Sequence, residues 1–235
     1  MKIFRYLALS ALLAMSASVT NAQNFDKGLE AINAGDYQTA FKEFLPLAEG
    51  GNASAQSNLG NMYDNGNGVI QNDVEAVKWY RLAADQGLAT AQFNLGNMYR
   101  NGEGVIQNDV EAVKWYRLAA DQGNAFAQNN LGAMYDNGEG VVQNYVEAVK
   151  WYRLAADQGN ARAQNNLGAM YEIGKGAIQN NVLAHMWYNI ASANGSENSA
   201  KWRDEIAAKM TREEIAKAQA MAQDCISSGY KICGD

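Results

Sequence analysis

A 36-residue unit repeats through the middle of this chain, and it constrains the fold more than any other feature. The first copy spans residues 52–87, and further copies follow at 88–123, at 124–159 and, in altered form, at 160–195. The first two copies agree at 31 of 36 positions, and all four align without a gap. Self-similarity at a fixed period of this length indicates a solenoid, in which stacked units share one continuous core.

Each copy is predicted to form two helices, here called helix A and helix B. In the first copy, helix A covers about 53–65, because Asn52 is a good N-cap and Gly66 can adopt the left-handed conformation that ends a helix. Gly60 lies inside this helix at a cost of about 1 kcal/mol relative to alanine, which suggests the close approach of a neighbouring helix. The expected core face of helix A is Ala55, Leu59, Met62 and Tyr63.

Helix B is expected over about 73–86 after a short glycine-rich connection. Asn72 followed by Glu75 has the pattern of a capping box, and Gly87 closes the helix. Buried candidates are Val74, Val77, Tyr80, Leu82, Ala83 and Ala84. Glu75, Lys78, Arg81 and Asp85 fit a solvated face with ion pairs three or four residues apart. The tryptophans that recur every 36 residues, at 79, 115, 151 and 187, favour packing between repeats over ligand stacking.

The resulting motif resembles the SEL-one-like repeat family, a relative of the tetratricopeptide repeats. In the first copy its residues are Ala53, Ala55, Gln56, Leu59, Gly60, Met62, Tyr63, Gly66, Gly68, Ala76, Trp79, Tyr80, Ala83, Ala84 and Gly87. The resemblance implies an all-α fold, a right-handed αα-superhelix of four 36-residue helix-turn-helix repeats. It also implies a scaffold or adaptor that binds other proteins.

Helical capping pairs are expected at both ends of the array. Residues 23–51 read as an N-terminal hairpin whose first helix presents Phe25, Leu29 and Ile32 on one face. Residues 196–235 hold two amphipathic helices, at about 197–209 and 212–225, with Thr211 and Glu214 placed for an N-cap. Their expected apolar contacts are Trp202, Ile206, Met210, Ile215, Ala218 and Met221.

The fourth copy shows why the C-terminal pair is needed. Its helix B carries Leu183, Met186, Asn189 and Ala193 where the third copy has Glu147, Lys150, Arg153 and Asp157. An apolar surface of this kind must be covered, and a terminal cap with a polar outer face covers the end of a solenoid.

Residues 1–22 have the features of a cleavable signal peptide, with Lys2 and Arg5 before an apolar run and small residues near Ala22. The alternative is a buried N-terminal helix. A periplasmic or secreted protein is expected, and in such a protein Cys225 and Cys233 predict a disulfide, with two free thiols as the alternative. The formal net charge of −6 disfavours nucleic acid as a partner, and no membrane insertion is expected.

The chain shows no pattern typical of catalysis. His185 is the only histidine and replaces the valine of the other copies, so a core position is expected for it, and no catalytic residue, metal site or cofactor is predicted. The 64–73 loop lacks the alternating oxygen ligands of a calcium loop. Some relatives of this family have been linked to β-lactams, but those carry cysteines in each repeat, and these repeats carry none.

Differences among the first three copies suggest a binding surface. On helix A they fall at offsets spaced three or four residues apart, which form one stripe, whereas helix B beyond its first residue does not vary. In this superfamily helix A generally lines the concave surface. The predicted partner-binding residues are Ser54, Ser57, Asn61, Asp64, Thr90, Phe93, Asn97, Arg100, Phe126, Asn129, Asp136, Arg162, Asn165 and Glu172. Chance drift in young repeats is the alternative explanation.

The function favoured by these observations is an exported, non-enzymatic scaffold that binds a protein or peptide through the helix A surface. Phe93 and Phe126, flanked by Arg100 and Arg162, have the composition of an interaction hot spot. The alternative is an enzyme or binding protein that acts on a cell-envelope substrate such as peptidoglycan or a β-lactam. That alternative needs a polar catalytic cluster.

Overall fold

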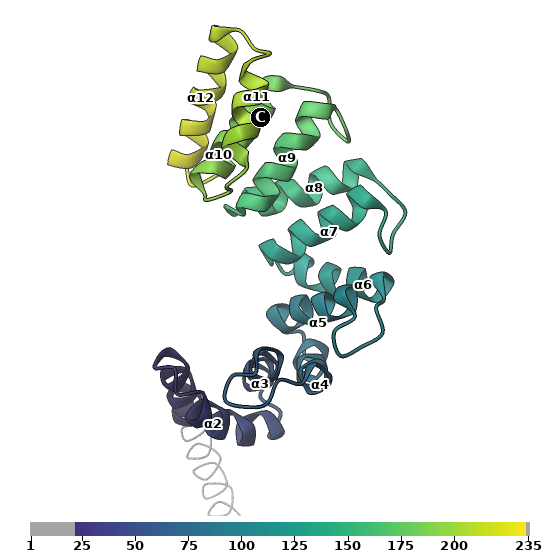
Figure 1. Cartoon of the computed structure of the whole chain (residues 1–235), viewed down its shortest axis with the longest axis vertical. Helices are drawn as coiled ribbons and strands as arrows, with labels where there is room; N and C mark the ends of the chain where they lie inside the picture. Colours follow the sequence, from purple (N-terminus) through teal and green to yellow (C-terminus); the bar gives the residue numbers. More distant parts are fainter. Residues whose placement is uncertain (1–21, 234–235) are drawn as a thin grey trace, which may run out of the picture. The chain divides into compact units, whose positions relative to one another are not determined.

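The computed structural model describes residues 22–233, and within this range the regular structure is entirely helical. The chain forms two compact units, Met1–Gln107 and Asn108–Asp235. Figure 1 labels their helices in chain order. The first holds a helix over residues 22–33 followed by α2 (Tyr37–Glu49), α3 (Ala53–Asn65), α4 (Asp73–Asp85) and α5 (Ala89–Asn101). The second holds α6 (Asp109–Asp121), α7 (Ala125–Asn137), α8 (Tyr145–Ala156), α9 (Ala161–Ile173), α10 (Asn181–Ala193), α11 (Ser199–Ala207) and α12 (Arg212–Ser227).

The all-α class and the helix-turn-helix repeats are thus confirmed. Helices α3, α5, α7 and α9 are the A helices, and α4, α6, α8 and α10 are the B helices. Residues 1–21 of the predicted signal peptide lie outside the described residues, so that prediction stays open.

In the first repeat the predicted N-caps and the glycine end of helix A form as expected, whereas the predicted capping box at Asn72 and Glu75 is incomplete, since the Asn72 backbone N–H donates to the carbonyl of Tyr63. The Asn52 side chain accepts from the amide of Ala55 at 2.9 Å, and Gly66 ends α3 with φ +69°. Asn72 accepts from the amides of Val74 and Glu75 at 3.1 Å. The Glu75 carboxylate pairs with Lys78 at 3.2 Å. In the C-terminal cap, Thr211 and Glu214 form a complete capping box.

The glycine inside helix A lets the tyrosine of helix B lie directly on its backbone. A Cβ built at Gly60 would lie 2.5 Å from the ring of Tyr80, closer than real Cβ contacts allow. The same pairing recurs in the second unit, with Gly132 under Tyr152 at 2.7 Å and Gly168 under Tyr188 at 2.9 Å. The close approach expected from the sequence is therefore the contact that holds the two helices of a repeat together.

A buried glutamine joins each A helix to the B helix before it. The amide nitrogens of Gln56 and Gln92 donate to the carbonyls of Ala48 and Ala84 at 3.0 and 3.1 Å. In the second unit, Gln128 and Gln164 donate to Ala120 and Ala156, both at 3.1 Å. All four glutamines are buried.

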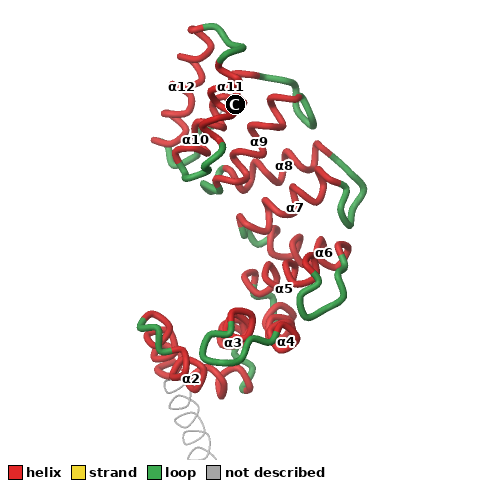
Figure 2. Tube along the Cα trace, viewed as in Figure 1, coloured by secondary structure: helices red, strands yellow, loops and turns green. Residues whose placement is uncertain are grey.

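The loop between helix A and helix B packs on the start of the preceding helix B. Figure 2 shows these connections as green loops. Gly104 adopts φ +65°, and a Cβ there would lie 2.2 Å from the carbonyl oxygen of Asp73. In the second unit, Gly140 and Gly176 make the same contact with Asp109 and Tyr145, at 2.3 and 2.1 Å. The second glycine of the G-x-G motif is therefore needed both for its positive φ and for backbone packing.

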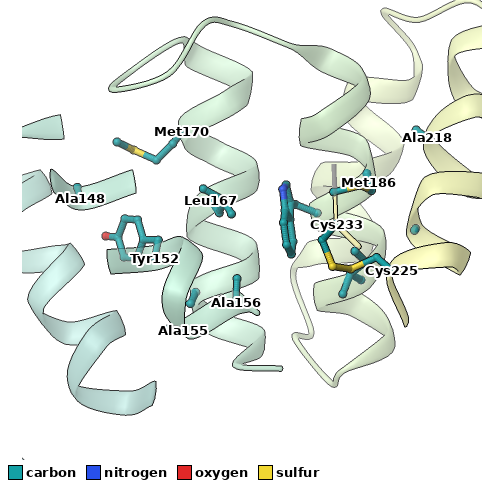
Figure 3. Close-up of a cluster of buried hydrophobic side chains, with 14 residues drawn as sticks. Ala148, Tyr152, Ala155, Ala156, Leu167, Met170, Met186, Ala218, Cys225 and Cys233 are labelled. Carbon is teal, nitrogen blue, oxygen red and sulfur yellow. A yellow bond between two sulfur atoms is a disulfide. The ribbon is translucent and has the colours of Figure 1, made fainter. Parts of the chain in front are cut away.

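The C-terminal helices cover α10 as predicted. Met186 is buried in a cluster with Ala218 and Cys225 of α12 (Figure 3). A disulfide joins Cys225 to Cys233, eight residues later in the sequence. The Arg153 guanidinium donates to the carbonyl of Cys233 at 2.6 Å, which ties the cap to α8.

Several residues predicted as buried are instead exposed. Leu29 faces out because the Phe44 ring occupies the space over Gly28, where a Cβ would lie 2.5 Å from it. Val74 is exposed because the next loop brings only the backbone of Gly104 close to it. Leu82 and Trp202 are also exposed, and the Lys201 ammonium lies over the Trp202 ring. On α10, Ala193 is exposed although its neighbours on that face are covered.

His185 occupies a core position, as predicted. Its side chain is buried on α10, and no described residue accepts or donates at Nδ1. Burial lowers the pKa of His185, the nearby Arg203 guanidinium lowers it further, and Asp204 acts in the opposite direction. The neutral imidazole is therefore the form that the fold accommodates.

The pH dependence of stability should change when His185 is replaced by the valine of the other repeats. The unfolded chain binds a proton below about pH 6.5, whereas the folded state resists it, so stability falls as the pH drops through that value. We expect wild type to lose more unfolding free energy than His185→Val between about pH 7 and about pH 5. Urea denaturation of both proteins at both pH values measures this free energy. A difference in unfolding free energy between the two proteins that is the same at both pH values would contradict the prediction.

The loop contact can be tested with two glycines of the second unit that share a positive φ. Gly140→Ala should lower the free energy of unfolding by about 3 kcal/mol or more, since it adds a backbone collision to the strain. Gly123→Ala should cost only about 1 kcal/mol, because at φ +89° nothing lies within 4 Å of its added Cβ. Chemical denaturation measures both, and equal losses would argue against loop packing.

Reducing the disulfide should loosen the C-terminal cap. Closing a loop of this length stabilises a fold by about 2–3 kcal/mol through the unfolded state. We expect a reductant to lower the melting temperature of wild type and to leave that of Cys225→Ala/Cys233→Ala unchanged. A wild-type melting temperature that ignores the reductant would show that the bridge contributes nothing.

Candidate interaction surface

The predicted stripe on helix A divides into exposed and enclosed positions. The first offset, near the start of each A helix, is exposed in all four copies, at Ser54, Thr90, Phe126 and Arg162. The three later offsets are mostly half-buried, except that Ser57 and Asn129 are buried and Asn61 is exposed. A partner that contacts the surface would therefore meet the first offset before the others.

In the first unit, the later stripe residues hydrogen bond to the tyrosine of helix B. The Tyr80 hydroxyl donates to Asn61 Oδ1 at 2.6 Å and to Asp64 Oδ2 at 3.2 Å. Asn94 of the next A helix also donates to Asn61, at 3.2 Å. Burial raises the pKa of Asp64, and the hydrogen bond from Tyr80 opposes this shift. These contacts give Asn61 and Asp64 a packing role. The other stripe residues of this unit, Phe93, Asn97 and Arg100, are half-buried on α5.

In the second unit, the stripe residues at the later offsets also form hydrogen bonds. Asn129 accepts from Asn166 of the next A helix at 3.2 Å, and Asn165 accepts from the hydroxyl of Ser199 at 2.8 Å. Glu172 accepts from Tyr188 at 3.0 Å and from Lys209 at 3.3 Å. Part of the variation along the stripe therefore accompanies contacts between neighbouring helices.

Asp136, the last stripe residue of α7, is half-buried. Burial raises the pKa of its carboxyl group, and the Lys175 ammonium lowers it.

A hollow of about 790 Å³ in the second unit brings two stripe residues together. Phe126, at the start of α7, and Arg162, at the start of α9, both line it. A second wall is the turn that leads into α11, with Asn194, Glu197 and Asn198. Phe126 is 62% exposed.

Hydrogen bonds hold the walls of this hollow in place. Gln158 and Asn194 donate to the buried glutamines Gln128 and Gln164, each at 2.8 Å. The Tyr230 hydroxyl donates to Asn194 Oδ1 at 2.9 Å. The turn that forms the second wall is thereby tied to both the repeat core and the disulfide-closed end of the chain.

The hollow offers apolar, cationic and amide groups within one rim. The Phe126 ring can pack against an apolar side chain, the Arg162 guanidinium can pair with a carboxylate, and the wall amides can bond a peptide backbone. Such a mixture is typical of protein-binding hot spots. Among residues 22–233, no group of three His, Cys, Asp or Glu side chains is arranged to hold a metal ion. No helix in this range is long and apolar enough to cross a membrane.

The sequence predicted Phe126 and Arg162 as binding residues, but not the residues of the turn before α11 that also line this hollow. Phe126 and Arg162 stand out because they differ from their counterparts in other copies. Glu197 and Asn198 lie in the turn after the last repeat, where no neighbouring copy gives a comparison. Asn194 ends the fourth copy, at the offset that holds Gln158 in the third. Phe93 belongs to the first unit and Phe126 to the second, so the predicted pairing of the two rings stays a prediction.

Comparisons with known proteins agree with this architecture. The family model of the Sel1 repeat matches residues 53–88, 89–124, 125–160 and 161–196. These matches begin one residue later than the copies defined above and together cover more than half of the chain. No curated protein matches the chain.

Two crystal structures of proteins with 34% and 33% sequence identity to this chain show the same fold. A Sel1 repeat protein from Oxalobacter formigenes is 34% identical with a TM-score of 0.76, over 88% of this chain and 83% of that one. The second is c5321, a protective antigen present in uropathogenic Escherichia coli strains. It is 33% identical with a TM-score of 0.79, over 95% of this chain. The match covers 52% of c5321, so this chain spans about half of that protein.

Sel1 repeat proteins generally mediate protein–protein interactions and are generally non-catalytic. The four matched repeats, the helical pairs of both units and the two related crystal structures all lead to one assignment. The chain belongs to the Sel1 repeat family.

Proposed function

We propose that this protein is an exported, non-enzymatic scaffold that binds a segment of another protein through the exposed ends of its A helices. The observation that carries the proposal is the hollow rimmed by Phe126 and Arg162. Both residues occupy the one stripe offset that is exposed in every copy. Export rests on the leader-like residues 1–22 and agrees with a disulfide in the C-terminal cap.

The chemistry of the hollow favours a peptide segment over a small metabolite. Its rim is open and combines one aromatic ring with one guanidinium group, and its walls present side-chain amides. An extended segment with an apolar residue next to an acidic one would satisfy all three features. The aromatic ring would supply contact area, and the arginine would select the acidic neighbour.

Removing these two side chains should abolish capture of the partner. We expect Phe126→Ala and Arg162→Glu each to weaken binding by about tenfold or more, the usual effect of truncating a hot-spot residue. The measurement is a pull-down from periplasmic extract with mass spectrometry, followed by titration of the recovered partner.

A matched control separates binding from folding. Leu118→Ala removes a large apolar side chain that is 42% exposed on α6 of the same unit and does not line the hollow, and it should leave capture intact. Thermal melts of all three variants should agree with wild type within a few degrees, since surface substitutions change stability little. Equal partner recovery by wild type and by Phe126→Ala/Arg162→Glu, with unchanged melts, would remove the hollow from the proposal. Hydrolysis of muropeptides by the pure protein would overturn the non-enzymatic assignment.

A further inference from the structure

Every repeat exposes one aliphatic side chain almost completely. Ile70, Ile106, Val142 and Ile178 are 91%, 91%, 89% and 90% exposed, and all four occupy the same place in the loop between helix A and helix B. Single exposed aliphatic residues are common on protein surfaces. The recurrence at nearly full exposure is regular, and where exposed apolar side chains gather into a patch they mark interaction sites.

The loops hold these side chains in fixed positions. In the second unit, Gly140 and Gly176 press the loop backbone against the first residues of α6 and α8, two positions before Val142 and Ile178. The same contacts place the loops beside Val110 and Val146, which are 64% and 65% exposed at the starts of those helices. We call Val110, Val142, Val146 and Ile178 the aliphatic ridge of the second unit.

Charged residues flank this ridge with opposite signs. Glu139 lies three residues before Val142, and Lys175 lies three residues before Ile178, at equivalent positions of successive loops. The Glu139 carboxylate accepts from the side chain of Asn137 at 3.0 Å. The Lys175 ammonium lies 4.8 Å from the centre of the Tyr145 ring, beside Val146. Each charge is thus engaged by a neighbour at the end of its own A helix or at the start of the preceding B helix.

We propose that the aliphatic ridge is a self-association surface and that its occupant is a second copy of this chain, related by a two-fold axis. The axis would lie in the plane of the ridge surface and perpendicular to the direction in which the repeats stack. It would pass midway between the loops of Val142 and Ile178. Val142 of one copy then faces Ile178 of the other, and Ile178 faces Val142. The same operation sets Glu139 opposite Lys175 on both sides, so the charges complement each other as well.

The periodicity of the ridge is the reason for choosing a second copy. A partner must present apolar groups at the spacing of the repeat, and another copy of the chain does so by construction. Each exposed side chain offers on the order of 100 Å² of apolar area. The four ridge residues thus supply roughly half of the ~800 Å² per partner of a standard interface. Their loops and flanking charges would supply the rest.

Charge reversal gives a decisive test by sedimentation equilibrium of the purified protein. Glu139→Lys alone and Lys175→Glu alone each turn two attractive pairs per dimer into repulsive ones, and each should weaken dimerisation about tenfold or more. An equimolar mixture of the two variants should dimerise like wild type, since each chain then faces the opposite charge. The double variant Glu139→Lys/Lys175→Glu should also recover, because the swapped pairs attract again.

The apolar part of the ridge needs its own variants. Val142→Ser/Ile178→Ser should make the protein monomeric at concentrations where wild type is dimeric. The control Leu118→Ser/Leu154→Ser removes two leucines that are each 42% exposed on B helices of the same unit, and it should stay dimeric. Circular dichroism should show equal helix content in both double variants.

Two results would overturn the proposal. One is a wild-type protein that sediments as a monomer up to about 100 μM, a concentration at which an interface of this size should form. The other is a dimer that tolerates Val142→Ser/Ile178→Ser, or single charge variants that fail to recover when mixed. Phe126→Ala/Arg162→Glu should leave dimerisation unchanged, so failure of the proposed function and failure of this inference are separately visible.

Discussion

Each repeat buries one glutamine side chain, and the stacking of helices depends on it. Its amide nitrogen donates to the last turn of the preceding B helix, as Gln128 does to Ala120. Its amide oxygen accepts from the end of the following B helix, as Gln128 does from Gln158. One side chain thus links three helices, and an unmatched buried amide costs about 1–3 kcal/mol. This penalty fixes the register of neighbouring helices more strictly than apolar contacts alone, which tolerate sliding.

The same constraint positions the candidate binding hollow. Asn194 takes the place of the helix B glutamine in the last repeat and donates to Gln164 at 2.8 Å. Its oxygen accepts from Tyr230, so the turn before α11 is held by both the repeat core and the C-terminal cap. A rigid wall in the same hollow as Phe126 and Arg162 lowers the ordering cost of binding. The surface that meets a partner is therefore set by the hydrogen bonds that stack the repeats.

Periodic patterns made much of this fold predictable from the sequence. The helix limits follow from Asn52 and Gly66, and the close packing follows from the glycine inside helix A. The buried role of Gln56 escaped prediction, because a polar residue inside a helical motif gives no sign of its distant acceptor. Exposure of Val74 was also missed, since it depends on a loop 30 residues later in the chain. In the candidate site, variation among copies identified Phe126 and Arg162. It also marked the buried Asn129, whose partner Asn166 occupies an offset that is asparagine in every copy.

Comparison of the copies also separates two kinds of surface. Helix A carries a different side chain at its first exposed offset in every copy, from serine and threonine to phenylalanine and arginine. Such a surface has no internal symmetry and fits a foreign partner, which need not repeat. The loop offset of Ile70 stays aliphatic and about 90% exposed in all four copies. A surface with the period of the chain is complementary to another object of the same period. A second copy of the chain meets that condition with the fewest assumptions, which leaves the varied surface available for a different protein.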